Sequence, residues 1–206
     1  MAFPRFRAAA LGAAAITLTL TACAPPGQDG DPGVAATYEG TTVTNVDVAD
    51  IEAAWIFDTK GQDVANRRQI LTIELLRDDL LAKTKELGQP VSWAVAESYA
   101  DMWITFKGEQ GEASDEVIAA TQGVLALALL AYADPSFETI REISDNAAKS
   151  AVVSPRSGVY STDALLDSVQ QALQSAEGQQ LGQFAYTEFQ NVSAFTDADR
   201  DWFARD

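Results

Sequence analysis

The side chains that could do chemistry in this chain are almost all carboxylates. The sequence contains 30 Asp and Glu residues, a single cysteine and no histidine. Without histidine, Ser-His-Asp and Cys-His catalysis are excluded, as are zinc or iron sites with imidazole ligands. The remaining possibility is a carboxylate pair of the kind that glycosidases use. Only Glu74, inside an apolar helical pattern, is in a setting that would raise a carboxyl pKa. We therefore expect no catalytic activity.

Three acidic residues near the end of the chain alternate as the ligands of a calcium loop do. These are Asp197, Asp199 and Asp201. Trp202 stands where such a loop needs a glycine, and no acidic residue closes it. Thr196 followed by Asp199 instead favours a capping box at the start of a short helix. The sequence predicts no metal ion and no cofactor.

The only cysteine, Cys23, ends an N-terminal segment with an unusual pattern. Arg5 and Arg7 provide a positive start, an apolar run extends over residues 8–20, and two small residues precede the cysteine. This arrangement is typical of a secretory signal. The apolar run is also shorter than the roughly 20 residues that a membrane-spanning helix needs.

The tetrad Leu20-Thr21-Ala22-Cys23 resembles the lipobox of bacterial lipoproteins. That resemblance implies cleavage between Ala22 and Cys23, attachment of a diacylglycerol to Cys23, and acylation of the new amino group, for example by palmitate. We expect a signal peptide at residues 1–22 and a protein anchored by lipid on the extracytoplasmic face of a bacterial membrane. The alternative is an ordinary signal peptide with an incidental cysteine.

Composition beyond the signal predicts an acidic domain on a tether. Residues 23–34 are rich in Pro, Gly and Asp and predict a flexible tether, and the remainder suffices for one domain with its own core. The formal net charge is −16, and loss of Arg5 and Arg7 with the signal lowers it to −18. Such a surface repels nucleic acid and tolerates cationic peptides. Salt adaptation explains the acidity equally well.

Hydrophobic periodicity predicts a mainly α-helical protein with a small antiparallel sheet. We expect strands at 36–38 and 42–44 around a turn at Gly40, and a third strand at 151–153. Thr44 and Asp47 predict a capping box. The helical segments are expected at 46–57, 64–87, 92–107, 114–133, 135–149, 163–176 and 197–204, with a loop at 154–162 and a polar hinge at 178–182. In the longest helix, Glu74 with Arg77 and Asp79 with Lys83 have the spacing of ion pairs.

Three stretches resemble a known family. Residues 40–48 (Gly-Thr-Thr-Val-Thr-Asn-Val-Asp-Val) are similar to the opening of the N-terminal domain of SurA-type periplasmic chaperones, where a strand pair leads into a first helix with an acidic cap. Residues 68–92 resemble the next block, a long helix followed by glycine and by a serine that starts another helix. Residues 153–158 (Val-Ser-Pro-Arg-Ser-Gly) resemble the segment that ends this domain in actinobacterial lipoproteins, with Ser157 in place of the usual aromatic residue and Tyr160 as its possible substitute.

The resemblance implies a SurA N-terminal-like helical domain at residues 35–162, followed by a C-terminal helical extension at 163–206. We expect no prolyl isomerase domain of the parvulin type, because the sequence leaves no room for one and contains none of the histidines typical of its site. The resemblance therefore implies a chaperone-like or peptide-binding lipoprotein without catalytic activity, whose partners are unfolded or extended polypeptides of the cell envelope. The alternative is a non-catalytic subunit that docks on one specific envelope protein or complex.

The helix expected at 92–107 carries four aromatic residues that could contact a peptide: Trp93, Tyr99, Trp103 and Phe106. Aromatic side chains make adaptable contacts with varied apolar segments. Aromatic residues at helical spacing are, however, more often part of the core. The peptide-binding hypothesis requires one or two of the four side chains to be exposed.

Overall fold

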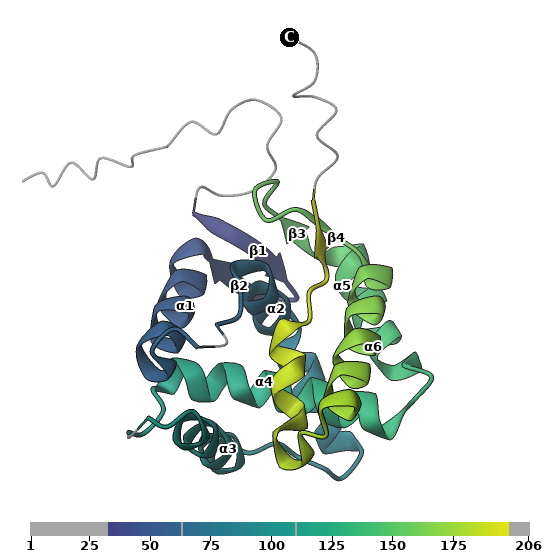
Figure 1. Cartoon of the computed structure of the whole chain (residues 1–206). Coiled ribbons are helices and arrows are strands. Elements are labelled where there is room, and N and C mark those ends of the chain that lie inside the picture. Colours follow the sequence, from purple (N-terminus) through teal and green to yellow (C-terminus); the bar gives the residue numbers. More distant parts are fainter. Residues whose placement is uncertain (1–32, 63, 110, 198–206) are drawn as a thin grey trace, which may run out of the picture.

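The computed structural model describes residues 33–62, 64–109 and 111–197, and within them the protein is mainly helical with a small antiparallel sheet (Figure 1). The predicted signal peptide, Cys23 and most of the predicted tether lie outside the described residues. The tether was expected to reach residue 34, but Val34 already belongs to the first strand. The helices are α1 (Asn45–Thr59), α2 (Arg67–Glu86), α3 (Trp93–Phe106), α4 (Asp115–Ala133), α5 (Glu138–Ser150), α6 (Thr162–Gln179) and the 3₁₀-helix η1 (Gly182–Asn191).

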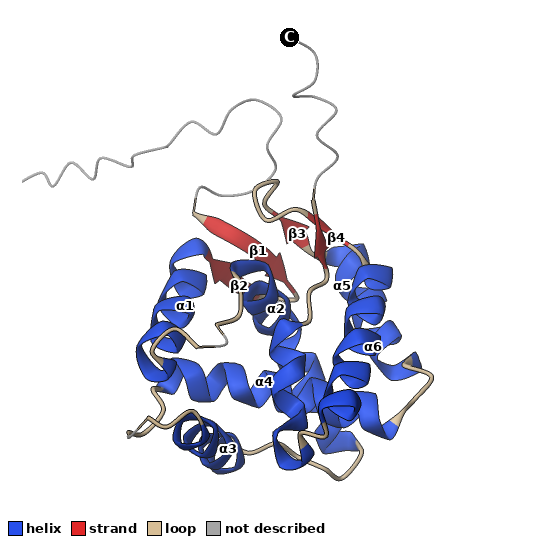
Figure 2. Ribbon diagram, viewed as in Figure 1, coloured by secondary structure: helices blue, strands red, loops and turns tan. Residues whose placement is uncertain are grey.

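The predicted three-stranded sheet is confirmed (Figure 2). Its strands β1 (Val34–Tyr38), β2 (Thr41–Thr44) and β3 (Val152–Val153) are antiparallel and lie in the order β2-β1-β3. Glu39 and Gly40 turn the chain between β1 and β2, both with positive φ, which is the geometry of a two-residue hairpin. The hydroxyl of Tyr38 donates to Asp79 at 2.7 Å and ties the sheet to α2.

A second sheet was not predicted. The strands β4 (Val159–Tyr160) and β5 (Phe195–Thr196) pair antiparallel, so part of the expected loop at 154–162 is a strand. Thr196 lies in β5, which contradicts its predicted role as the cap of a helix; most of that expected helix, including Asp199, is outside the described residues. Gly158 has a φ of +106°, and a Cβ there would collide with the carbonyl oxygen of Thr196. Only glycine therefore allows the two chain segments to approach so closely.

The start of α1 follows the predicted capping box. The Thr44 hydroxyl accepts from the Asp47 amide at 3.1 Å, and Asp47 accepts from the Thr44 amide at 2.7 Å. Helix α2, by contrast, begins at Arg67 rather than at Val64. Asn66 forms its own capping box with Gln69 and accepts from the amides of the first turn, so the helix cannot start earlier.

Two further expectations about helix ends and ion pairs are wrong. Pro135 was expected in the first turn of α5, but that helix starts at Glu138, because Asp134 accepts from the Thr139 amide at 3.0 Å and forms the turn before it. Lys83 pairs with Glu86 at 3.3 Å, while Asp79 accepts from Tyr38. The pair of Glu74 with Arg77 is confirmed.

Helix α4 forms the centre of the core. It packs against α1, α2, α3, α5 and η1, and its apolar run from Val124 to Ala131 is buried except for Leu129. In the described part of the chain it is the one helix whose length and composition would allow it to cross a membrane, yet most of it is buried inside the protein. The apolar run of α4 is therefore part of the core of the protein.

The C-terminal segment closes the core instead of hinging away from it. Helix α6 continues to Gln179 and η1 starts at Gly182, so the stretch expected as a polar hinge is a short connection between two helices. Phe189 of η1 is fully buried, and η1 packs against both α4 and α6. This unpredicted segment also covers part of α3, which determines which aromatic residues reach the surface.

Candidate functional site

Helix α3 carries the four aromatic residues predicted to contact a peptide, but it presents them to two different surfaces. Ser92 starts the helix and accepts from the Val95 amide at 3.3 Å. Helix geometry places Trp93 and Phe106 about 20 Å apart along the axis and about 140° apart around it. A single stripe therefore cannot contain both, and each end of α3 needs a separate description.

At the C-terminal end, Trp103, Phe106 and Phe184 form what we call the aromatic cluster. The ring centroid of Phe106 lies 5.4 Å from that of Trp103 and 4.4 Å from that of Phe184. Phe106 is 58% exposed, whereas Trp103 is 5% exposed. Lys107 Nζ lies 4.4 Å from the centre of the Trp103 ring. The cluster thus has a buried base and one aromatic ring at the surface.

Tyr99 contributes to packing more than to the surface. It is half-buried, and its ring meets that of Tyr186 edge-on at 5.2 Å. The Tyr186 hydroxyl donates to the Tyr99 carbonyl at 2.8 Å, and burial raises the pKa of Tyr186 well above its usual value. Sequence reasoning missed Phe184 and Tyr186. The closely spaced aromatic residues of the segment after Gly182 were the available signal.

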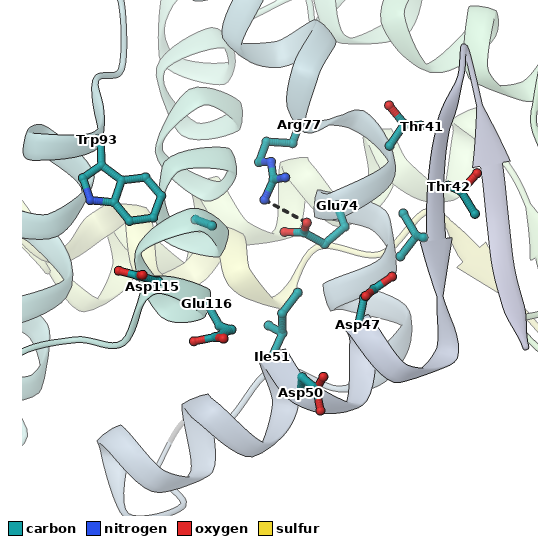
Figure 3. A pocket seen from close by; sticks show the side chains of 12 residues that line it. Thr41, Thr42, Asp47, Asp50, Ile51, Glu74, Arg77, Trp93, Asp115 and Glu116 are labelled. Atoms are coloured by element: carbon teal, nitrogen blue, oxygen red, sulfur yellow. Dashed lines mark ion pairs between the residues drawn. The ribbon is translucent and has the colours of Figure 1, made fainter. Parts of the chain in front are cut away.

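At the N-terminal end, Trp93 lines a groove of about 570 Å³ that we call the acidic groove (Figure 3). Its walls come from β2, α1, α2, α3 and α4, which are distant in the sequence. In Figure 3, Trp93 stands at one end and Thr42 of β2 at the other, with Glu74 between them. The lining residues are Thr41, Thr42, Val43, Asp47, Asp50, Ile51, Glu74, Arg77, Trp93, Asp115, Glu116 and Ala119.

The lining of the acidic groove contains five carboxylates and one cationic side chain, Arg77. Three of the carboxylates have a role in the fold. Asp47 caps α1, and Asp115 and Glu116 lie in the first turn of α4, where the helix dipole favours negative charge. Asp50 and Glu74 have no such role at a helix start.

Glu74 is the most unusual of these groups. Its Oε2 lies 2.8 Å from Arg77 Nη1, and its side chain is 10% exposed. Its other oxygen, Oε1, is buried and makes no hydrogen bond. Burial raises the pKa of Glu74 above the ordinary 4.5; the Arg77 guanidinium opposes this shift, while Asp78 and Asp47 add to it. The raised pKa agrees with the sequence-based expectation for Glu74, but its setting is not apolar, because Glu74 pairs with Arg77 and lines a groove with four other carboxylates.

Within residues 33–62, 64–109 and 111–197, no three His, Cys, Asp or Glu side chains are close enough together to hold a metal ion. Asp197, the first of the three alternating aspartates, lies 2.8 Å from Arg68 Nη2. Asp199 and Asp201 lie outside the described residues. The lining of the acidic groove includes carboxylates and an aromatic ring, which are groups that attract cations.

In comparisons with protein-family models, with curated proteins and with solved structures, nothing matches this chain. Its likeness to SurA-type chaperones thus rests on the sequence motifs alone.

Proposed function

We propose that this protein is a membrane-tethered extracytoplasmic lipoprotein that binds unfolded or extended polypeptides of the cell envelope, in the manner of a chaperone and without catalysis. The observation that carries the proposal is the aromatic cluster. Phe106 is 58% exposed and rests on the rings of Trp103 and Phe184. An exposed aromatic ring with a rigid aromatic base is suited to apolar side chains of a peptide.

The test is suppression of the aggregation of a chemically unfolded client protein by the purified lipoprotein. Replacement of Phe106 by Ser should weaken this suppression several-fold while stability changes little, because the ring is exposed. Phe57→Ser is the matched control, since Phe57 is 74% exposed on α1, away from the cluster. Equal loss in both variants, or no suppression by the wild type, would contradict the proposal.

The membrane tether has its own test. Cys23 should carry acyl chains in protein isolated from cells, and Cys23→Ser should release the protein from membranes or leave its signal uncleaved. Two or three acyl chains bind a membrane far more firmly than one. A wild-type N-terminus without acyl mass would contradict the proposed anchor.

The alternative function is docking on one specific envelope protein or complex. Its support is a second apolar surface on α1, where Ile56 and Phe57 are both exposed. Crosslinking in intact cells followed by pull-down separates the two functions, because a docking subunit yields one partner and a chaperone-like protein yields many.

A further inference from the structure

The acidic groove carries negative charge that no cationic side chain of the described residues neutralises. Asp50, Asp115 and Glu116 line it and make no ion pair with any residue that the structure describes. Arg77, the one cation of the lining, is already paired with Glu74. Carboxylates gathered in a concave surface focus their field and raise the local concentration of cations.

Glu74 Oε1 provides an independent reason to expect a ligand. The Glu74 side chain is nine-tenths buried in the middle of the groove, and this oxygen has no hydrogen-bond partner. A buried acceptor without a donor costs free energy, and such groups are rare in folded proteins. A group with N–H donors and no acceptor, such as an ammonium or a guanidinium, would satisfy this oxygen once the atoms that cover it move aside.

Trp93 offers a third element of recognition. It is 43% exposed and stands at the end of the groove, with Asp115 near it (Figure 3). A cation near the face of an indole ring is attracted by the electrons of the ring, and tryptophan is the best aromatic residue for this contact. Carboxylates beside an exposed tryptophan thus match the chemistry of a lysine or arginine side chain.

The strand next to the groove indicates where such a side chain would come from. β2 is an edge strand of the three-stranded sheet, and Thr41, Thr42 and Val43 line the groove. An extended polypeptide binds a sheet by pairing with an edge strand as an additional strand. A peptide beside β2 would place alternate side chains in the groove.

We infer that the acidic groove binds a lysine or arginine side chain of the extended polypeptide, with Glu74 Oε1 and the neighbouring carboxylates as acceptors and Trp93 as the aromatic contact. This site rests on the proposed peptide-binding function and specifies its ligand. The polypeptide would then contact both ends of α3. Its apolar side chains would bind at the aromatic cluster, and its lysine or arginine side chain would bind in the acidic groove.

The test measures binding of fluorescent peptides to the intact lipidated protein in detergent at low salt. One peptide carries leucines and two arginines, and its matched partner has citrulline, the neutral isostere, in place of each arginine. The arginine peptide should bind about tenfold more tightly, as expected for a charge-assisted hydrogen bond. Glu74→Gln should remove most of this gain, and Trp93→Ala should reduce affinity about threefold.

Asp167→Asn is the matched control, because Asp167 is an exposed carboxylate of α6 and does not line the groove. It should leave the gain unchanged. An equal reduction in Asp167→Asn and Glu74→Gln would mean that net charge attracts the peptide, and would overturn the inference.

The remaining outcomes separate this inference from the proposed function. Equal binding of the arginine and citrulline peptides would overturn the groove site but support peptide binding at the aromatic cluster. If neither peptide binds, both proposals fail. Displacement of the arginine peptide by an equal concentration of spermidine would assign the groove to free polyamines and overturn the inference as stated.

Discussion

The position of α4 against α2, and with it the shape of the acidic groove, depends on the missing side chain of Gly123. A Cβ at this position would lie 2.6 Å from Ile73 Cγ2 and 3.4 Å from Arg77 Cγ. Ordinary carbon contacts are about 3.5–4.0 Å, so the first approach is too short by about 1 Å. Gly123→Ala must therefore move the two helices apart or displace Ile73.

The expected cost follows from two opposing effects. Alanine is favoured over glycine inside a helix by about 1 kcal/mol. Overpacking of a well-packed core costs about 1–3 kcal/mol, and the upper half of this range applies because Ile73 is 3% exposed and cannot swing into solvent. We expect Gly123→Ala to lower the free energy of unfolding by about 1–2 kcal/mol.

Urea unfolding followed by circular dichroism measures this difference. Gly178→Ala is the matched control, because Gly178 also lies in a helix, α6, and its Cβ would meet nothing within 4 Å. That variant should be slightly more stable than the wild type. In an Ile73→Ala background, Gly123→Ala should cost much less. Wild-type or higher stability of Gly123→Ala itself would refute the reasoning.

Five other variants test the aromatic residues, the groove and the contact between Asp58 and Ser114. Trp103→Ala should lose about 3–5 kcal/mol of stability because its ring is buried, whereas Trp93→Ala should stay within about 1 kcal/mol; equal losses in thermal unfolding would contradict the assigned positions. Burial raises the pKa of Glu74 above 4.5 in the folded state. The folded protein therefore binds a proton at Glu74 more readily than the unfolded chain does. The free energy of unfolding should fall as pH rises from about 4.5 through the raised pKa. Glu74→Gln should remove that part of the pH dependence in urea unfolding, and an unchanged profile would argue against the raised pKa. Asp58→Ala should cost about 2 kcal/mol, because Asp58 accepts from both the amide and the hydroxyl of Ser114 at 2.9 and 2.7 Å; Asp58→Asn, which keeps an acceptor, should lose less.

Local sequence patterns were sufficient to predict the three-stranded sheet and most of the helices. The β-branched residues around Gly40 and at Val152 and Val153 indicate strands, and the Thr44–Asp47 box indicates where α1 begins. Where a predicted helix start was wrong, a capping residue further along the chain determines where the helix begins. Asn66 delays α2 although Val64 continues the apolar pattern.

The missed elements depend on contacts that are distant in sequence. β4 and β5 have two residues each, and they pair across residues 159–196 because Gly158 lets the chain approach Thr196. η1 is held by burial of Phe189 and Tyr186 against other helices. Neither element has a local pattern long enough for periodicity to indicate it.

The candidate site shows the same limit. The sequence identifies the helix that carries four aromatic residues, without deciding which of them are exposed, and it selects Glu74 as an unusual carboxyl. It could not bring these together, since Trp93, Glu74 and Asp47 line one groove only where five elements of the chain pack. It also could not distinguish the exposed ring of Phe106 from the buried ring of Trp103, because their exposure depends on how the helices pack around them, including Phe184 of η1, which contacts both rings.

The arrangement of the two surfaces on α3 fits the tether that we propose. The described chain enters the fold at β1, and Figure 1 places β1 at the opposite end of the molecule from α3. An anchor at Cys23 would attach the protein by its sheet end, so the aromatic cluster would face away from the membrane. The acidic surface would be repelled by anionic head groups, which keeps the groove open to solvent. A polypeptide emerging near the membrane could then reach both ends of α3. The axial separation of roughly 20 Å between Trp93 and Phe106 alone corresponds to about six residues of extended chain, and the angle of about 140° between them around the helix makes the path longer. In peptides shorter than this, either arginine or leucine should increase the affinity, but the two increases should not add.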